Sequence, residues 1–170
     1  DVARFCEVDL KTIHNYADAG KIAHHRTEGR HLRFRRNHVV QFLRTHGYPL
    51  PDEVTSARPL VFVALPGSLA EEVGRRLAGR FFVRSFASAL VAIAGVVGGE
   101  PDAIVLSADD TTWPGAAGAA ALKSSAETSW PLLVLVALEG EARAAGADLV
   151  LHPAELGRVG SELARALAVD

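Results

Sequence analysis

The strongest constraint on the fold is a series of five short apolar segments in residues 59–170, each followed by a helical pattern. Strands that are buried on both faces of a sheet have nearly continuous apolar sequences. Neighbouring parallel strands are joined by crossover connections, usually helices. We therefore predict an α/β domain with a doubly wound, five-stranded parallel sheet. Its predicted strands are Leu60–Leu65, Phe81–Arg84, Ala103–Leu106, Leu132–Leu138 and Leu149–Leu151.

The predicted helices of this domain are Ser68–Ala78, Ala87–Val97, Gly115–Ala126, Glu139–Ala145 and Ala154–Ala168. The second of these helices is apolar on almost every side. A helix of that kind is either deeply buried or part of an interface. It is therefore a candidate contact surface for a second protomer.

Residues 1–47 have a different pattern. Asp1–Phe5 already has the sequence of a helix interior, so we expect further residues before Asp1. Asp9 can cap a helix over Leu10–Ala19, and Gly20 can end it. The last helix of this part is predicted over Asn37–Thr45.

A β-hairpin is predicted between these helices, with strands Ile22–Thr27 and His31–Arg35 and a turn at Glu28–Arg30. Side chains alternate between the two faces of a strand. Leu32 and Phe34 are therefore expected to face the core. The residues expected to point outward are His31, Arg33 and Arg35.

Two prolines mark the boundary between the two parts. Pro49 and Pro51 break helical periodicity and stiffen the chain toward an extended conformation. We therefore expect a first domain over residues 1–47, a linker over 48–58 and a second domain over 59–170.

Charge is distributed unequally between the two domains. Residues 1–50 hold nine Lys/Arg and five Asp/Glu, a net charge of about +4, and six of the seven histidines. The remainder holds nine Lys/Arg and fifteen Asp/Glu, a net charge of about −6. A cationic segment suits contact with phosphates, so we expect the first domain to meet nucleic acid.

Other classes of protein are disfavoured. The longest apolar runs fall short of the roughly 20 residues that span a bilayer, and no signal segment opens the chain, so we expect a cytoplasmic location, associated with the nucleoid. The single cysteine, Cys6, excludes an internal disulfide. His24, His25 and His31 lie close together but lack the defined donor set of a metal site, so we expect no metal.

Residues 2–46 resemble the MerR/excisionase family of winged helix-turn-helix domains. The resemblance rests on Val2-Ala3, Thr12-Ile13, Tyr16, Gly20-Lys21-Ile22 and the hairpin Arg26–Phe34. Ala23 and Leu32 depart from it, since proline and arginine are usual there. In that family the second helix enters the major groove and the hairpin, or wing, lies along the backbone or minor groove. The DNA-binding residues that this resemblance implies are Lys11, Thr12, His14, Asn15, Tyr16, Arg26, Arg30, His31, Arg33 and Arg35.

Residues 59–169 resemble a response-regulator receiver domain, a flavodoxin-like fold, over its whole length. A receiver needs an acidic pair after its first strand, a phosphoacceptor Asp after the third, a Thr/Ser after the fourth and a Lys after the fifth. Here the acidic pair is replaced by Ala64-Leu65 or Leu65-Pro66. The other three positions hold Ser107, Val136 and His152. Without carboxylates to hold magnesium, we expect no phosphoryl transfer.

Two pairs of residues near these positions have more than one possible role. Asp109 and Asp110 follow Ser107 and could replace the acceptor, although capping or solvating the next loop is the simpler interpretation. Trp113 and Trp130 are expected on the side of the domain where a receiver works, where they could line a ligand pocket or contact a partner.

Our leading interpretation is a DNA-binding transcription regulator with no catalytic residues and no cofactor. Its phosphorylation-independent, receiver-like domain would form a homodimer or bind a protein partner. One alternative is a receiver-like adaptor that mainly binds proteins. Another is a sensor of a small anionic ligand such as a nucleotide second messenger.

Overall fold

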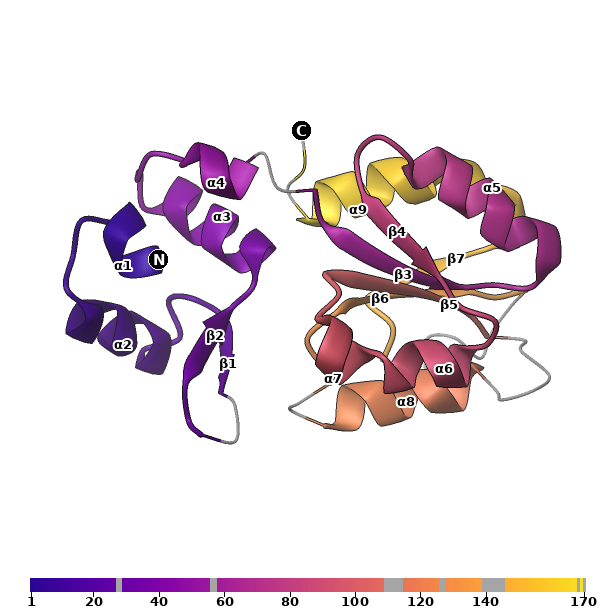
Figure 1. Cartoon of the computed structure of the whole chain (residues 1–170), viewed down its shortest axis with the longest axis horizontal. Helices are drawn as coiled ribbons and strands as arrows, with labels where there is room; N and C mark the ends of the chain where they lie inside the picture. Colours follow the sequence, from indigo (N-terminus) through magenta and orange to yellow (C-terminus); the bar gives the residue numbers. More distant parts are fainter. Residues whose placement is uncertain are drawn as a thin grey trace.

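The computed structural model describes residues 1–26, 29–55, 58–108, 115–125, 128–138, 146–167 and 169. Figure 1 shows a small helical body with a hairpin beside a larger body built on a parallel sheet. The first contains α1 (Val2–Phe5), α2 (Leu10–Asp18), β1 (His24–Arg26), β2 (Leu32–Phe34), α3 (Arg36–Thr45) and α4 (Asp52–Thr55). No helix in these residues is long and apolar enough to cross a membrane.

The second body alternates strands and helices, as the sequence predicts. Its elements are β3 (Leu60–Ala64), α5 (Gly67–Leu77), β4 (Phe82–Ser85), α6 (Ala89–Ala94), α7 (Val96–Gly99), β5 (Ala103–Ser107), α8 (Gly115–Ser124), β6 (Leu132–Val136), β7 (Leu149–Leu151), the 3₁₀ helix η2 (Pro153–Arg158) and α9 (Val159–Leu167). The strands pair in parallel in the order β4-β3-β5-β6-β7. This confirms the predicted doubly wound, flavodoxin-like sheet.

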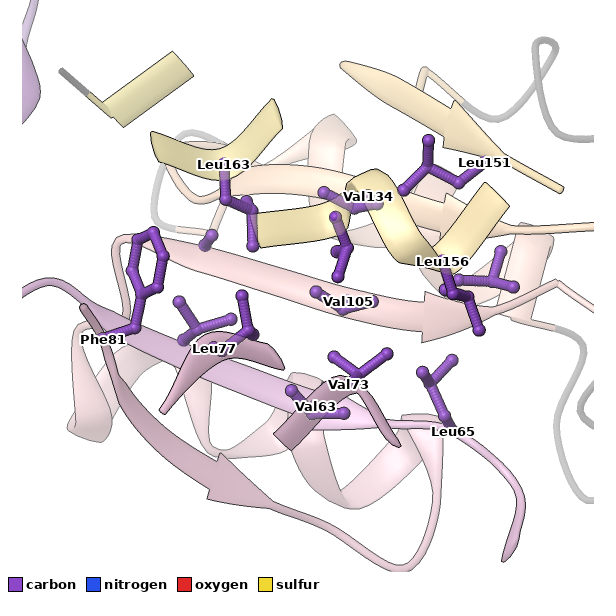
Figure 2. Packing of buried hydrophobic residues seen from close by; sticks show 14 of the residues in the cluster. Val63, Leu65, Val73, Leu77, Phe81, Val105, Val134, Leu151, Leu156 and Leu163 are labelled. Carbon is purple, nitrogen blue, oxygen red and sulfur yellow. The ribbon is translucent and has the colours of Figure 1, made fainter. Parts of the chain in front are cut away.

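Side chains on β3, β5, β6 and β7 alternate between two apolar layers. On β3, Val61 and Val63 enter one layer while Phe62 enters the other. Helices α5 and α9 cover the first layer, and α6, α7 and α8 cover the second (Figure 1). Figure 2 shows the first layer, where Leu77 of α5 and Leu163 of α9 pack over the central strands. Burial of these side chains is the main force that holds the sheet and helices together.

The helix predicted over residues 87–97 is divided at Gly95 into α6 and α7. Its inner side is fully buried, but Leu90 and Val91 are 49% and 51% exposed. The helix is therefore not deeply buried. Gly99, in α7, lies so close to the sheet that a Cβ atom there would be 2.5 Å from Cζ of Phe62.

Three further predicted segments are placed differently or not described. The helix predicted over 139–145 lies outside the described residues. The final helix begins as η2, capped by the side chain of His152. The segment predicted as an extended linker, 48–58, contains α4 instead.

Part of that segment belongs to the first core. Val54 is 8% exposed and packs in the same cluster as Ile13 and Leu43. Its carbonyl accepts a hydrogen bond from Nε of Arg36 at 2.7 Å, and Arg4 pairs with Glu53 at 2.6 Å. The prolines do interrupt the helical pattern, but apolar side chains beyond them still find the core of the first body.

Candidate nucleic-acid interface and the two edges of the sheet

An N-terminal cap and a buried apolar side orient helix α2 so that its polar face is exposed to solvent. Asp9 caps it as predicted, because its Oδ1 accepts a hydrogen bond from the Thr12 N–H at 2.6 Å. That hydrogen bond lowers the pKa of Asp9. Ile13 and Ala17 are buried on the inner side. The opposite side of α2 presents Lys11 and Asn15, both exposed.

The wing lies beside that face. Strands β1 and β2 pair antiparallel, with His25 opposite Arg33. Nη2 of Arg26 contacts Oδ1 of Asp18, at the end of α2, at 2.7 Å. This ion pair connects the wing to α2. The exposed cations at the tip of the wing and along β2 are Arg30 and Arg33.

The structure leaves most of the predicted DNA-binding residues accessible on α2 and the wing, and His14 of α2 lines one groove with His31 and Arg33 of the wing. Lys11, Asn15, Arg26, Arg30, His31 and Arg33 are exposed, and Thr12 and His14 are half-buried. Tyr16 packs inward instead, with ring centroids 5.6 Å from Phe42 and 6.4 Å from His46. Its contacts stabilise the α2–α3 packing.

Arg35 does not point outward, which corrects the sequence expectation. It is only 8% exposed, and its guanidinium lies 5.2 Å from the ring centroid of Trp130 in the second body. Burial lowers the pKa of Arg35 to about 9, against the attraction of Asp102 and nearby acids. The guanidinium therefore stays protonated at neutral pH. The alternation of side chains along the strand correctly predicts that Arg35 lies outside the core of the first body. It gives no information about contacts with the second body.

Trp130 is also placed differently from the prediction. It lies two residues before the start of β6, so it is at the amino-terminal edge of the sheet, opposite the edge where a receiver works. Its ring stacks on His25 with centroids 4.9 Å apart and planes 14° apart. The two bodies also meet where Nη1 of Arg36 donates to the carbonyl of Leu167 at 3.4 Å.

We call His25, Arg35, His38, Asp102 and Trp130 the amino-edge cluster. Asp102 precedes β5, and its Oδ2 accepts from the Leu60 N–H at 2.8 Å. Burial raises the pKa of Asp102, while that hydrogen bond and Arg35 lower it. Burial lowers the pKa of His25 and of His38, and the charge of Arg35 lowers both further.

The sequence alone does not predict that the five residues of the amino-edge cluster lie together. The position of Trp130 just before the predicted strand Leu132–Leu138 is the available signal, because strand direction decides the edge at which a flanking residue lies.

At the carboxyl-terminal edge, Ser107 is the last residue of the central strand β5 and is 6% exposed. It lies beside Val136 of β6. The residues that directly follow β3, β5, β6 and β7 are Leu65, Ala108, Ala137 and His152, and none is Asp or Glu.

The side chain of His152 caps the helix η2. Its Nδ1 accepts a hydrogen bond from the Ala154 N–H at 3.1 Å. This contact holds the His152 side chain over the first turn of η2. Asp109, Asp110 and Trp113 lie outside the described residues. Across the described part of the chain, no group of three or more His, Cys, Asp or Glu could hold a metal ion.

Comparisons with known proteins agree with both parts of this description. Residues 1–47 match the helix-turn-helix domain family. Among curated proteins, no sequence matches the chain.

Solved structures match the second body. The chemotaxis response regulator CheY4 of Vibrio cholerae is 16% identical with a TM-score of 0.54, and the match covers 63% of this chain and 99% of that one. The response regulator domain of Thermotoga maritima CheB is 15% identical with a TM-score of 0.54, covering 67% and 99%. The phosphorylated cyanobacterial phytochrome response regulator RcpA is 12% identical with a TM-score of 0.55, covering 66% and 95%. These similarities establish the receiver fold of the second body.

Proposed function

We propose that this chain is a transcription regulator of the MerR/excisionase type that binds double-stranded DNA through α2 and the wing. The observation that supports this proposal is the single surface formed by the polar face of α2 and the exposed wing cations. A helix fits the major groove, where Lys11, His14 and Asn15 could reach base edges or phosphates. Arg30, His31 and Arg33 would contact phosphates, which position a protein without reading sequence.

We further propose that the receiver-like domain works without phosphoryl transfer. The acceptor position holds Ser107, and no carboxylate directly follows the described ends of the strands. A hydroxyl with neither a base nor a magnesium site beside it is a poor phosphoryl acceptor. Regulation would then come from binding energy that differs between two states of the protein.

The test of DNA binding is a salt titration. Fluorescence anisotropy with random-sequence and genomic duplexes should give affinities that fall steeply as salt rises, because phosphate contacts release counterions. Binding that is absent at low salt, or that does not depend on salt, would contradict the proposal.

A second candidate function, a homodimer or protein-binding adaptor, is favoured by one observation. Leu90, Val91 and Val97 form an exposed apolar strip on α6 and α7, with fractions exposed of 49%, 51% and 55%. Sedimentation velocity of the wild-type chain and of the Val91→Asp variant separates the candidates. A dimer that dissociates in the variant supports self-association through this strip, and a monomer in both supports the simple DNA-binding protein.

A further inference from the structure

A cavity of about 360 Å³ lies beside the amino-edge cluster. It shares Arg26 with the proposed DNA-binding surface, and Asp102 is the one residue of the cluster that does not line it. His25, Arg26, Arg35 and His38 line it from the first body. Ser129 and Trp130 line it from the second. The cavity is therefore completed only when the two bodies are packed together.

Two buried nitrogen atoms of this lining lack hydrogen-bond partners. Nε of Arg35 and Nδ1 of His38 are both enclosed, and neither has a partner among the described residues. Arg35 is more than nine-tenths buried. A buried polar group almost always finds a partner, and each exception calls for an explanation such as an unseen water, ion or ligand. Because a guanidinium only donates, the missing partner of Arg35 must be an acceptor.

The charge of the lining specifies the kind of acceptor. Arg26 and Arg35 are cationic, and no Asp or Glu among the described residues lines the cavity. Nη2 of Arg26 already contacts Asp18, which leaves Arg35 as the principal cation without an ion pair among the described residues. A guanidinium forms its strongest hydrogen bonds to phosphate and carboxylate oxygens, and phosphate is matched by its planar array of donors.

The cavity is large enough to admit a small molecule as well as individual water molecules. One water molecule takes up about 30 Å³ of liquid, whereas small-molecule sites begin at roughly 300 Å³. Trp130 provides a rigid aromatic wall, since its ring is held by the His25 stack and the Arg35 guanidinium. A ligand with an anionic group and an uncharged remainder therefore fits better than a bare anion.

We propose that this cavity binds a small phosphate monoester whose phosphate group accepts hydrogen bonds from Arg35 and His38 beside Trp130. The site goes beyond the proposed function, because its residues are not on the exposed face of α2 and its occupancy can be measured without DNA. Since both bodies contribute to the lining, the bound ligand stabilises their packed arrangement relative to any arrangement that separates them.

The first experiment uses Trp130 as the reporter. The chain holds two tryptophans, so Trp113→Phe leaves Trp130 alone. Fluorescence is titrated with AMP, inorganic phosphate and adenosine at constant ionic strength. AMP should give a saturable change, phosphate the same or a weaker one, and adenosine none. Equal affinity for adenosine and AMP would overturn the proposal, as would a failure of both AMP and phosphate to saturate. Equal affinity for phosphate and AMP would identify the phosphate group as the whole ligand.

The second experiment compares matched variants. Arg35→Gln should weaken AMP binding at least about tenfold, as expected for loss of a charge-assisted hydrogen bond. Arg30→Gln removes an exposed wing cation that does not line the cavity, and should leave the affinity for AMP unchanged.

Circular dichroism checks that the variants fold. If Arg35→Gln does not fold, His38→Gln provides the same comparison, and the shift of the Arg35 Nε–H resonance on adding AMP to wild type is a direct readout. Equal affinities in wild type and the folded variant, or an unmoved resonance, would overturn the site.

A third experiment tests the histidines. His25 faces Arg33, Arg35, His24 and Glu100, and His38 faces Arg35 and His25. An anion between these groups favours their protonated forms, so binding should strengthen as pH falls from about 8 to about 6. Sulfate is the probe because its own charge is constant over this range. Sulfate binding that is independent of pH, or that weakens on acidification, would contradict a phosphate site at this place.

Discussion

The two edges of the parallel sheet carry opposite chemistry. At the carboxyl-terminal edge, where response regulators react, the strands β3, β5 and β6 end in Ala64, Ser107 and Val136, and no residue that directly follows them is Asp or Glu. The amino-terminal edge carries Asp102 and Trp130, against which the first body packs Arg35. Function must therefore be argued from the site and not from the fold. Among the described residues, the two buried polar atoms without a partner belong to Arg35 and His38, which line the cavity beside Trp130 at the amino-terminal edge.

The largest expected effect is a loss of stability when an acidic residue is placed at the carboxyl-terminal edge of the sheet. Ser107→Asp places a carboxylate at a position that is 6% exposed and has no cation site. We expect the free energy of unfolding to fall by about 3 kcal/mol, the cost of burying a polar group without a partner. Urea denaturation followed by circular dichroism measures this. Ser107→Ala is the control and should stay within about 1 kcal/mol of wild type. A fully stable Ser107→Asp that accepts phosphate from acetyl phosphate would show that the edge retains receiver chemistry.

The second prediction is a smaller loss of stability, caused by crowding near the amino-terminal edge of the sheet. Gly99 precedes the strand start that carries Asp102, and a Cβ atom there would be 2.5 Å from the fully buried ring of Phe62. Gly99→Ala should therefore lower the free energy of unfolding by about 1–3 kcal/mol through overpacking. Gly98→Ala, in the same helix, meets nothing within 4 Å and should be neutral or stabilising, since alanine favours helix. Thermal unfolding of the two variants side by side checks the difference, and equal melting temperatures would show that Phe62 can move aside.

The smallest expected effect is a change in the salt dependence of DNA binding. It distinguishes the roles of Arg33 and Arg35, which are two residues apart in the sequence. Arg33 is exposed on the wing and Arg35 is buried against Trp130. Arg33→Ala should reduce the slope of log affinity for DNA against log salt by about 0.9, the value for one phosphate contact. Arg35→Ala should leave that slope unchanged and shift the fluorescence of Trp130 toward that of a more exposed indole. The proposed division of roles would be wrong if Arg35→Ala flattened the salt slope as much as Arg33→Ala does.

Local patterns in the sequence predicted the parts of the molecule that depend on local physics. Asp9 as the cap of α2 and the five buried strands follow from capping chemistry and hydrophobic patterning. The position of Ser107 at the end of β5 follows from the same strand assignments.

The relations between the two bodies could not be predicted in this way. The alternation of side chains on β2 places Arg35 away from the first core, but only packing against Trp130 buries it. Residues 52–55 were assigned to a linker because of the preceding prolines, although Val54 completes the first core. The cavity near Trp130 is lined from segments about a hundred residues apart, so no sequence window contains it.

The central claim is that the receiver fold of this chain regulates without phosphoryl transfer. The direct measurement is intact-mass spectrometry after incubation with acetyl phosphate and magnesium, combined with DNA-binding isotherms of the treated and untreated protein. We predict an unchanged mass and superimposable isotherms, because the central strand β5 ends in a serine, Ser107, and no carboxylate directly follows the described strand ends. A stoichiometric phosphoryl adduct on Ser107, Asp109 or Asp110, together with a changed affinity for DNA, would contradict the account.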